Sequence, residues 1–220
     1  MGCRDWDAAS ARLAARALEA GEPTAWFEQL YAAGERGEID MPWSRTEPHP
    51  LLMRWLPTVG PGDGRSAVVV GCGLGADAEF VAAQGFVTSA FDISATAVRT
   101  AEQRHPHSPV RYRTADLFAL PEEWQRAFDL VVEIITIQAL PVALRDRAVA
   151  AVAALVAPGG TAMVVENVRD DGDPLPDRPP WPFSRAEIDS FADHGLQAVA
   201  LTRHSGAVSR WQAVFGCPPP

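Results

Sequence analysis

The chain has little positive charge and few cysteines. Its 220 residues include 19 lysines and arginines against 28 aspartates and glutamates, which gives a formal net charge of −9. Such an acidic chain is poorly suited to nucleic-acid phosphates, so no nucleic-acid partner is expected. The three cysteines, at positions 3, 72 and 217, are odd in number and scattered along the chain. This spacing excludes a disulfide framework and favours the reducing cytoplasm.

Long apolar runs and internal repeats are missing as well. No segment near the N-terminus is apolar enough for a signal peptide or a membrane span, so no membrane partner is expected. Apolar residues nevertheless make up 47% of the chain, which allows a large core. A chain of this length is most simply one domain with extensions. No feature of the sequence specifies an oligomeric state.

The most informative segment is a glycine-rich turn after a short apolar run. Residues 67–77 read Ala-Val-Val-Val-Gly-Cys-Gly-Leu-Gly-Ala-Asp, which places Gly71, Cys72, Gly73 and Gly75 between three valines and a helical pattern. This order predicts a buried parallel strand that turns tightly into a helix beneath a ligand. Glycines are expected there because a Cβ would keep the ligand away from the backbone.

An acidic residue follows where such folds bind ribose. Asp92 lies about 20 residues beyond Gly71 at the end of a second apolar run, and Ile93 comes next. Its carboxylate could accept hydrogen bonds from two ribose hydroxyls. Asp92 could also belong to the N-cap region of the helix that Ser94 begins, and the two roles are compatible. The motif therefore predicts binding of a nucleoside-containing cofactor.

The glycines alone leave the identity of that cofactor open. Gly71, Gly73 and Ala76 also satisfy the dinucleotide fingerprint Gly-x-Gly-x-x-Gly/Ala, which binds NAD. A dehydrogenase normally carries this fingerprint near its N-terminus or follows it with a second substrate domain, and this chain shows neither arrangement. The wider pattern of the sequence therefore has to decide between the two cofactors.

That wider pattern favours S-adenosylmethionine. A third apolar run leads into Asp116 and Leu117, where a carboxylate could take the adenine amino group and the leucine could pack on the ring. Segment 128–133 and the Leu-Val-Ala-Pro-Gly-Gly of residues 155–160 follow. Together these features resemble the class I S-adenosylmethionine-dependent methyltransferases over residues 60–217. The resemblance implies a Pro-Gly-Gly turn before the fifth strand and S-adenosylmethionine as the cofactor.

The order of apolar runs predicts an α/β fold. It is a Rossmann-like, doubly wound, seven-stranded sheet, mostly parallel, because short apolar runs alternate with helical patterns. Ser205-Gly206 predicts a C-terminal antiparallel hairpin, which the resemblance also implies. Strands are expected near 67–71, 86–91, 110–114, 128–133, 161–166, 196–203 and 208–215, and helices near 76–84, 94–105, 143–156 and 184–194.

Residues 1–59 are expected to form an N-terminal helical cap over the site, and residues 60–217 the cofactor-binding domain. Trp26-Phe-Glu-Gln-Leu-Tyr31, Met41-Pro-Trp43 and Pro48-His-Pro-Leu-Leu52 resemble the opening of the thiopurine S-methyltransferase and thiol methyltransferase group. Carried over by position, Trp43 and then Trp26 are the expected cofactor contacts. An aromatic face attracts a sulfonium cation and helps to exclude water, although an aromatic core stripe would give the same pattern.

Catalytic candidates come from the cap and from the ends of strands four and five. They are Glu133, Glu166 and His49, and Glu133 could instead contact the cofactor. Other polar candidates at these strand ends are Thr136, Gln138 and Asn167. The proline-rich segment 174–182 is either a stiff loop over the pocket or a surface connection. No metal is expected, because the acidic residues of segment 170–173 have no partner at ligand spacing.

The sequence therefore predicts a cytoplasmic S-adenosylmethionine-dependent methyltransferase that acts on a small molecule. The group resemblance implies a thiol or another soft nucleophile as acceptor, that is, an S-methyltransferase. Glu133 and the three residues after it depart from the Asp-Arg that the group often has there, which leaves the acceptor open. O- or N-methylation of a specialised metabolite is an alternative within the class. An NAD-dependent reductase and a non-catalytic cofactor-binding protein are alternatives outside it.

Overall fold

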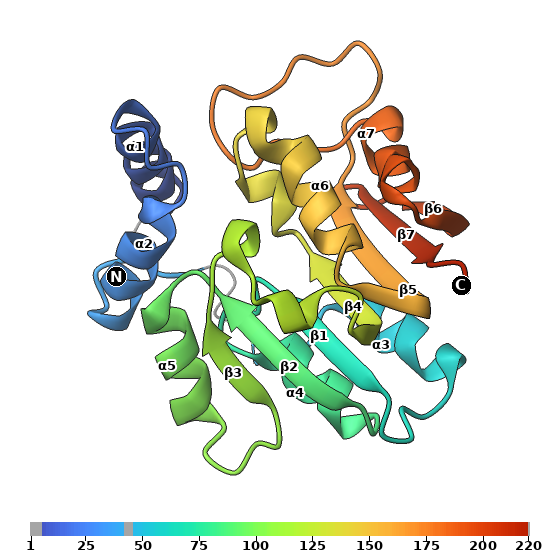
Figure 1. Cartoon of the computed structure of the whole chain (residues 1–220). Coiled ribbons are helices and arrows are strands. Elements are labelled where there is room, and N and C mark those ends of the chain that lie inside the picture. The colour runs from blue at the N-terminus through green and yellow to red at the C-terminus, as the bar shows by residue number, and fades with distance from the viewer. Residues whose placement is uncertain (1–5, 42–45, 220) are drawn as a thin grey trace.

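A seven-stranded mixed sheet forms the centre of the fold. The computed structural model describes residues 6–41 and 46–219, and Figure 1 shows their arrangement. Within these residues the sheet has the strand order β3-β2-β1-β4-β5-β7-β6. Neighbouring strands from β3 to β5 pair in parallel, and β7 runs antiparallel to both β5 and β6. The expected fold class is confirmed, including the C-terminal hairpin. The strands are β1 (Ser66–Val70), β2 (Val87–Asp92), β3 (Arg111–Thr114), β4 (Phe128–Ile134), β5 (Val156–Asn167), β6 (Gln197–His204) and β7 (Arg210–Gly216).

The central strands are apolar on both faces because helices cover both. In β1, Val68 and Val70 pack into one hydrophobic cluster, while Ala67 and Val69 pack into another on the opposite face. This alternation follows from the period of two along a strand. Helices α6 and α7 contribute to the first cluster, and α3 and α4 to the second (Figure 1). The helices are α1 (Trp6–Glu19), α2 (Ala25–Glu35), α3 (Pro50–Trp55), α4 (Ala76–Ala83), α5 (Ala95–Arg104), α6 (Arg145–Ala153) and α7 (Arg185–Asp189).

The region between α6 and β5 differs from the sequence-based expectation. The helix expected up to residue 156 ends at Ala153, and β5 already begins at Val156. Residues 157–160, with the Pro-Gly-Gly, form an irregularity within the strand, since Phe128 pairs with Val156 and Leu130 with Thr161. The Pro-Gly-Gly segment stays part of the strand because the end of β7 pairs with it. Backbone hydrogen bonds join Cys217 to the two glycines at 159 and 160. The last expected helix, at 184–194, is α7 followed by a 3-10 helix from Ser190 to His194.

The N-terminal helices and the proline-rich segment lie beyond the carboxyl ends of the parallel strands (Figure 1). Helices α1 and α2 pack on each other, and α2 also contacts α5. Helix α3 behaves differently, because Leu51, Leu52 and Leu56 pack in the same cluster as strand β1. The part of the expected cap that stands over this end of the sheet is thus α1 and α2. The division into residues 1–59 and 60–217 stays a prediction.

Candidate functional site

A cavity of about 340 Å³ opens at the carboxyl ends of the parallel strands. It is lined by the turns after β1, β2 and β4 and by side chains of α1 and α2. Strands β1 and β4 are neighbours, yet the chain leaves them toward opposite edges of the sheet. Ligands of open α/β sheets bind at such a switch point, and the volume lies in the usual range for small-molecule sites.

Backbone conformation and close packing both require glycine at positions 71 and 73. Gly71 has a φ of 59° and Gly73 a φ of 52°, in the left-handed region that other residues adopt at a cost. A Cβ on Gly71 would overlap the side chain of Thr136, and one on Gly73 would lie 2.9 Å from the hydroxyl of Tyr31. The expectation that the glycines keep Cβ atoms away from a ligand is therefore incomplete, because protein side chains also pack against this turn.

Replacing Gly71 with alanine is expected to destabilise the fold by about 1–2 kcal/mol, from the left-handed backbone alone. The new methyl group also pushes Thr136 out of its place on the cavity wall. Thermal unfolding measures the effect. Gly206→Ala is the control, because a Cβ there meets only the Val208 carbonyl oxygen at 3.7 Å. Equal melting temperatures for the two variants would contradict this account.

Asp92 is buried at the centre of the cavity wall, with 6% of its surface exposed. Its Oδ2 accepts a hydrogen bond from the Gly73 backbone N–H at 3.0 Å, and its Oδ1 accepts one from the Ser94 N–H at 2.9 Å. Burial, together with the charge of Glu28, raises the pKa of Asp92 to about 6 against these hydrogen bonds. A carboxylate has about four acceptor positions, so the backbone hydrogen bonds leave acceptor capacity for a ligand. Ser94 also caps α5 through its Oγ, as the sequence suggested.

The remaining predicted cofactor residues surround Asp92. Ile93, Asp116 and Leu117 line the cavity, and Asp116 Oδ1 accepts a hydrogen bond from the Phe118 N–H at 2.8 Å. Cys72 also lines the cavity, but burial and the nearby Asp92 raise the pKa of its thiol well above the usual range. The thiol is therefore unreactive.

Helix α2 forms an aromatic wall of the cavity. Trp26 and Phe27 stack with their ring centroids 4.0 Å apart, and both line the cavity together with Tyr31. Trp26 borders the cavity but is 4% exposed and packs in the core between α1 and α2, so its contact with the cofactor stays a prediction. Trp43 falls outside the described residues, so its contact with the cofactor stays a prediction. The sequence analysis did not single out Tyr31, although its i, i+4 spacing from Phe27 was a signal for the same face.

Glu133 and Glu166 are fully buried and do not appear in the lining of the cavity. Glu133 Oε1 accepts hydrogen bonds from the N–H groups of Thr136 and Ile137, and Glu166 Oε1 accepts one from Gln138 N–H. Burial raises the pKa of Glu133 to about 7, and burial with the charge of Glu133 raises that of Glu166 further. The pKa of Glu166 is raised by the charge of Glu133 in addition to burial, so Glu166 is the member of the pair that keeps a proton near neutral pH. The two carboxyl groups hold the turn after β4, because they accept its three consecutive backbone N–H groups.

The third predicted catalytic residue, His49, is also away from the cavity lining. It is buried at the start of α3, where its Nδ1 accepts a hydrogen bond from the Leu51 N–H at 3.2 Å. The backbone N–H of His49 donates to Asp77 Oδ1 at 2.6 Å. His49 is thus the N-cap of α3, and its place between two prolines serves the helix start.

The cavity continues beyond β4 to a wall that the sequence analysis predicted only in part. Gln138 and Asn167 line it as expected, and Pro179 and Pro180 show that the proline-rich segment does border the pocket. Asn167 Oδ1 is buried and makes no hydrogen bond within the described residues. Arg210, which pairs with Asn167 across β5 and β7, was missed because nothing local in the sequence indicates this register.

Ile135 is another residue of this wall that sequence reasoning did not find. It directly follows β4, lines the cavity and has a φ of 60°. A β-branched residue rarely adopts this conformation, which costs of order 1–3 kcal/mol. Its N–H donates to the Val165 carbonyl oxygen at 2.8 Å, so the sheet holds it in place. No sequence pattern marks such a position.

A buried ion pair anchors the proline-rich segment. The Arg145 guanidinium bonds to Glu187 Oε1 and, at 2.5 Å, to the Trp181 carbonyl oxygen. Arg169 bonds to the other oxygen of Glu187 at 2.8 Å. This clamp holds the segment against α6 and α7, and it explains why a chain of prolines can form a fixed wall of the cavity.

The described residues contain no group of three or more His, Cys, Asp or Glu side chains that could hold a metal ion. In the acidic segment after β5, Asp170 instead bonds to Arg203 through both carboxylate oxygens. Among the helices described, none combines the length and the apolar character needed to cross a membrane.

The family model described as "Thiopurine S-methyltransferase (TPMT)" matches residues 26–213, which include α2, the glycine turn and nearly all of the sheet. The chain belongs to the thiopurine S-methyltransferase family. This match extends through the N-terminal aromatic helix, so it confirms the group resemblance drawn from Trp26 and the segments near it.

Other proteins are similar to this family member over shorter stretches or in fold alone. The "Ubiquinone biosynthesis O-methyltransferase" of Paracidovorax citrulli is 31% identical over 119 residues, 52% of this chain, and the chain spans about half (48%) of that relative's length. The N-methyltransferase NodS from Bradyrhizobium japonicum with S-adenosyl-L-homocysteine has a TM-score of 0.66 at 21% identity, covering 86% of this chain and 98% of that one. A S-adenosylmethionine-dependent methyltransferase from Methanosarcina mazei has a TM-score of 0.66 at 15% identity, covering 79% and 100%.

S-adenosylmethionine is the cofactor of this family member. The site has the features that the cofactor requires: a buried carboxylate with free acceptor positions in Asp92, a second carboxylate in Asp116 and an aromatic wall on α2. The turn at Gly71 and Gly73, which has no Cβ atoms at these two positions, adjoins Asp92 because the Gly73 N–H donates to its carboxylate. The donors, acceptors and apolar surfaces of the cavity therefore fit a nucleoside that carries a cationic sulfonium group.

Proposed function

We propose that this protein transfers the methyl group of S-adenosylmethionine to a small-molecule acceptor, most simply a thiol. The observation that carries the proposal is the shape of the cavity within the family's fold. One end holds the predicted cofactor residues Asp92 and Asp116, and the other continues past β4 to Asn167 and Pro180. A cofactor at the first end leaves the second end for an acceptor.

The proposed placement of the cofactor follows the order of the strands. Asp116 and Leu117, after β3, take the adenine, and Asp92, after β2, takes the ribose hydroxyls. The turn at Gly71–Gly75, after β1, then receives the methionine portion. The sulfonium comes to lie near β4 and α2, where the aromatic side chains of α2 that line the cavity attract a cation.

In the proposed reaction the acceptor displaces the methyl group from sulfur in line. The leaving group is a neutral thioether, so it requires no acid. The protein's part is to hold nucleophile, methyl and sulfur in line, which can lower the barrier by up to about 7–11 kcal/mol. The walls formed by α2 and the proline-rich segment also keep water out.

The family description is the observation that favours a thiol acceptor, and the positions of the three predicted catalytic residues agree with an acceptor that needs none of them as a base. Glu133, Glu166 and His49 do not line the cavity, so none of the three predicted catalytic residues is placed to take a proton from an acceptor. A thiol, with a pKa of about 8.5, is partly ionised without a base, whereas an aliphatic hydroxyl nearly requires one. Relatives and fold neighbours include O- and N-methyltransferases, so oxygen and nitrogen acceptors are the alternatives within the class.

Titration calorimetry with S-adenosylmethionine, S-adenosylhomocysteine and NAD in parallel tests the proposal. Micromolar binding of the two sulfur compounds and none of NAD is expected. Release of S-adenosylhomocysteine is then compared for thiophenol, phenol and aniline, with thiophenol expected to react fastest. Binding of NAD alone would favour a reductase, and cofactor binding without turnover of any acceptor would favour a non-catalytic binding protein.

A cytoplasmic location, inferred from cysteine usage, also stays a prediction.

A further inference from the structure

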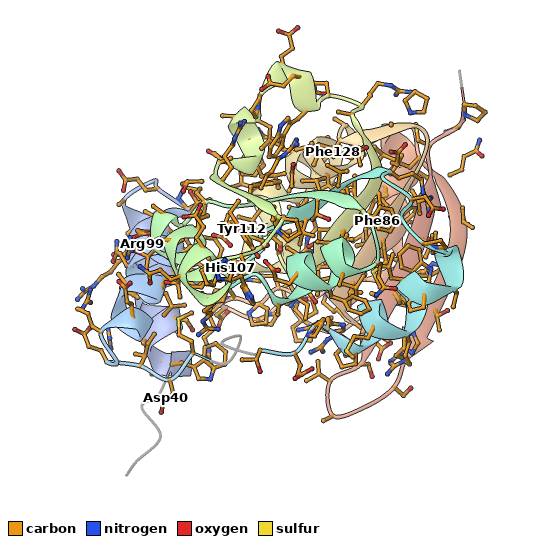
Figure 2. All side chains as sticks on the ribbon, turned by 90° about the horizontal axis from the view of Figure 1, so that it is seen from below. Asp40, Phe86, Arg99, His107, Tyr112 and Phe128 are labelled. Carbon is orange, nitrogen blue, oxygen red and sulfur yellow. The ribbon has the colours of Figure 1, made fainter. Side chains whose placement is uncertain are left out.

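Helix α2 presents two different faces to the rest of the protein. Phe27 and Tyr31 line the cavity, while Glu28 and Glu35 face helix α5. On the outer part of this contact, Arg99 of α5 bonds to both oxygens of Glu35 at 3.0 and 2.8 Å. Figure 2 shows Arg99 between α5 and the N-terminal helices. The position of the aromatic wall over the cavity therefore depends on how α2 is held on α5.

Glu28 is the inner and more tightly bound of the two glutamates. Its carboxylate accepts hydrogen bonds from Ser94 Oγ at 2.6 Å, Thr96 N–H at 3.0 Å and Thr96 Oγ1 at 2.5 Å. Burial acts to raise the pKa of Glu28, but the hydrogen bonds from Ser94 and Thr96 outweigh it and keep the pKa below its usual value. An ionised carboxylate at the N-terminus of the ten-residue helix α5 is also favoured by the helix dipole.

Ser94 connects this contact to the cofactor site. Its side chain donates to Glu28, while its backbone N–H donates to Asp92 Oδ1 at 2.9 Å. Asp92 Oδ2 is held on the other side by Gly73 N–H. Glu28 and Asp92 therefore bind the same residue, one through its side chain and one through its backbone. A change in how α2 sits on α5 moves Ser94 and, with it, the carboxylate that faces the cavity.

We propose that Glu28 is a positioning residue of the cofactor site, which fixes Asp92 through Ser94 while it holds the aromatic face of α2 over the cavity. Cofactor affinity and the docking of α1 and α2 then strengthen each other, because coupling between two equilibria is reciprocal. The inference rests on the proposed function, since it requires that Asp92 binds the cofactor. Glu28 itself does not line the cavity.

The test compares Glu28→Gln with Glu35→Gln. Both variants remove one negative charge from α2 at its contact with α5, but only Glu28 bonds to Ser94. S-adenosylhomocysteine affinity, measured by calorimetry, is expected to fall about fivefold in Glu28→Gln and to stay within twofold in Glu35→Gln. Equal affinities in the two variants would overturn the inference while leaving the proposed function intact. If the unaltered protein does not bind S-adenosylhomocysteine, the proposed function and this inference fail together.

A double-mutant cycle with Asp92→Ala separates positioning from a general loss of structure. If Glu28 acts through Asp92, Glu28→Gln costs less than twofold in the Asp92→Ala background. A full fivefold loss there would show that Glu28 acts through α2 without Asp92 and would overturn the inference that it positions Asp92 through Ser94. Hydrogen exchange gives a readout without turnover: S-adenosylhomocysteine is expected to slow exchange in residues 25–35 of the unaltered protein and of Glu35→Gln, but far less in Glu28→Gln.

Discussion

Replacing Glu166 with glutamine is expected to make the stability of the protein much less dependent on pH between about 5 and 7. The unaltered protein is expected to lose stability as the pH rises through this range, and the variant is expected to avoid much of that loss. Glu166 is fully buried, and its pKa lies well above the usual value because of burial and the charge of Glu133. The folded protein therefore keeps a proton that the unfolded chain releases above a pKa of about 4.3. Glutamine imitates the protonated form, since its oxygen can accept from Gln138 N–H and its NH₂ can donate to Glu133.

The sign and the size follow from proton linkage. The stabilisation from a group whose pKa is raised on folding is fully present below the unfolded pKa, and it is lost as the pH rises toward the folded pKa. One such proton changes the free energy of unfolding by about 1.4 kcal/mol per pH unit. Between pH 5 and 7 the stability of Glu166→Gln is thus expected to fall by up to about 2.7 kcal/mol less than that of the unaltered protein, the limit for one whole proton.

Denaturant unfolding at half-unit steps from pH 5 to 7 measures the difference. Glu22→Gln, the same chemical change on an exposed side chain, is the control and should leave the pH dependence unchanged. Parallel pH curves for Glu166→Gln and the unaltered protein would contradict a shared proton.

The sheet could be predicted from the sequence because its signals are local. Each central strand is a short apolar run, such as Ala67–Val70, and each is followed by a turn or a helical pattern that fixes the direction of the chain. The error at the start of β5 has a physical cause. Helix propensity favoured continuing α6 through residue 156, but pairing with β4 and β7 extended the strand through a Pro-Gly-Gly segment that reads locally as a turn.

The sequence could predict which residues line the cavity where their position at a strand end decides it. Asp92 and Asp116 line the cavity because the ends of parallel strands meet at one edge of the sheet. Burial is not local, so the sequence could not show that Glu133 and Glu166 point into the core as a pair rather than into the cavity. Arg210 and the contact of Glu28 with Ser94 depend on strand register and helix docking between distant segments. The strained backbone of Ile135 follows from the same tertiary contacts.

Replacing Asp92 with alanine is expected to weaken binding of S-adenosylmethionine at least tenfold. The loss corresponds to ribose hydrogen bonds worth roughly 1.5–3 kcal/mol in sum. Alanine also leaves the N–H groups of Gly73 and Ser94 without their acceptor, so Asp92→Asn, which keeps the volume and one acceptor oxygen, is measured beside it. Asp129→Asn is the matched control, because that carboxylate likewise accepts a backbone N–H but lies at the amino end of β4, away from the cavity.

The pH dependence of binding distinguishes a direct role of Asp92 from a structural one. The pKa of Asp92 without ligand is raised to about 6, mainly by burial, and ribose hydroxyls donate more strongly to the ionised carboxylate than to the protonated form. Affinity is therefore expected to be constant above about pH 7 and to fall as the pH drops below 6. In Asp92→Asn the affinity should be low at every pH, with this acid limb absent. An unchanged affinity in Asp92→Asn would remove Asp92 from the cofactor contacts, and an acid limb that survives the substitution would assign the titration to another group.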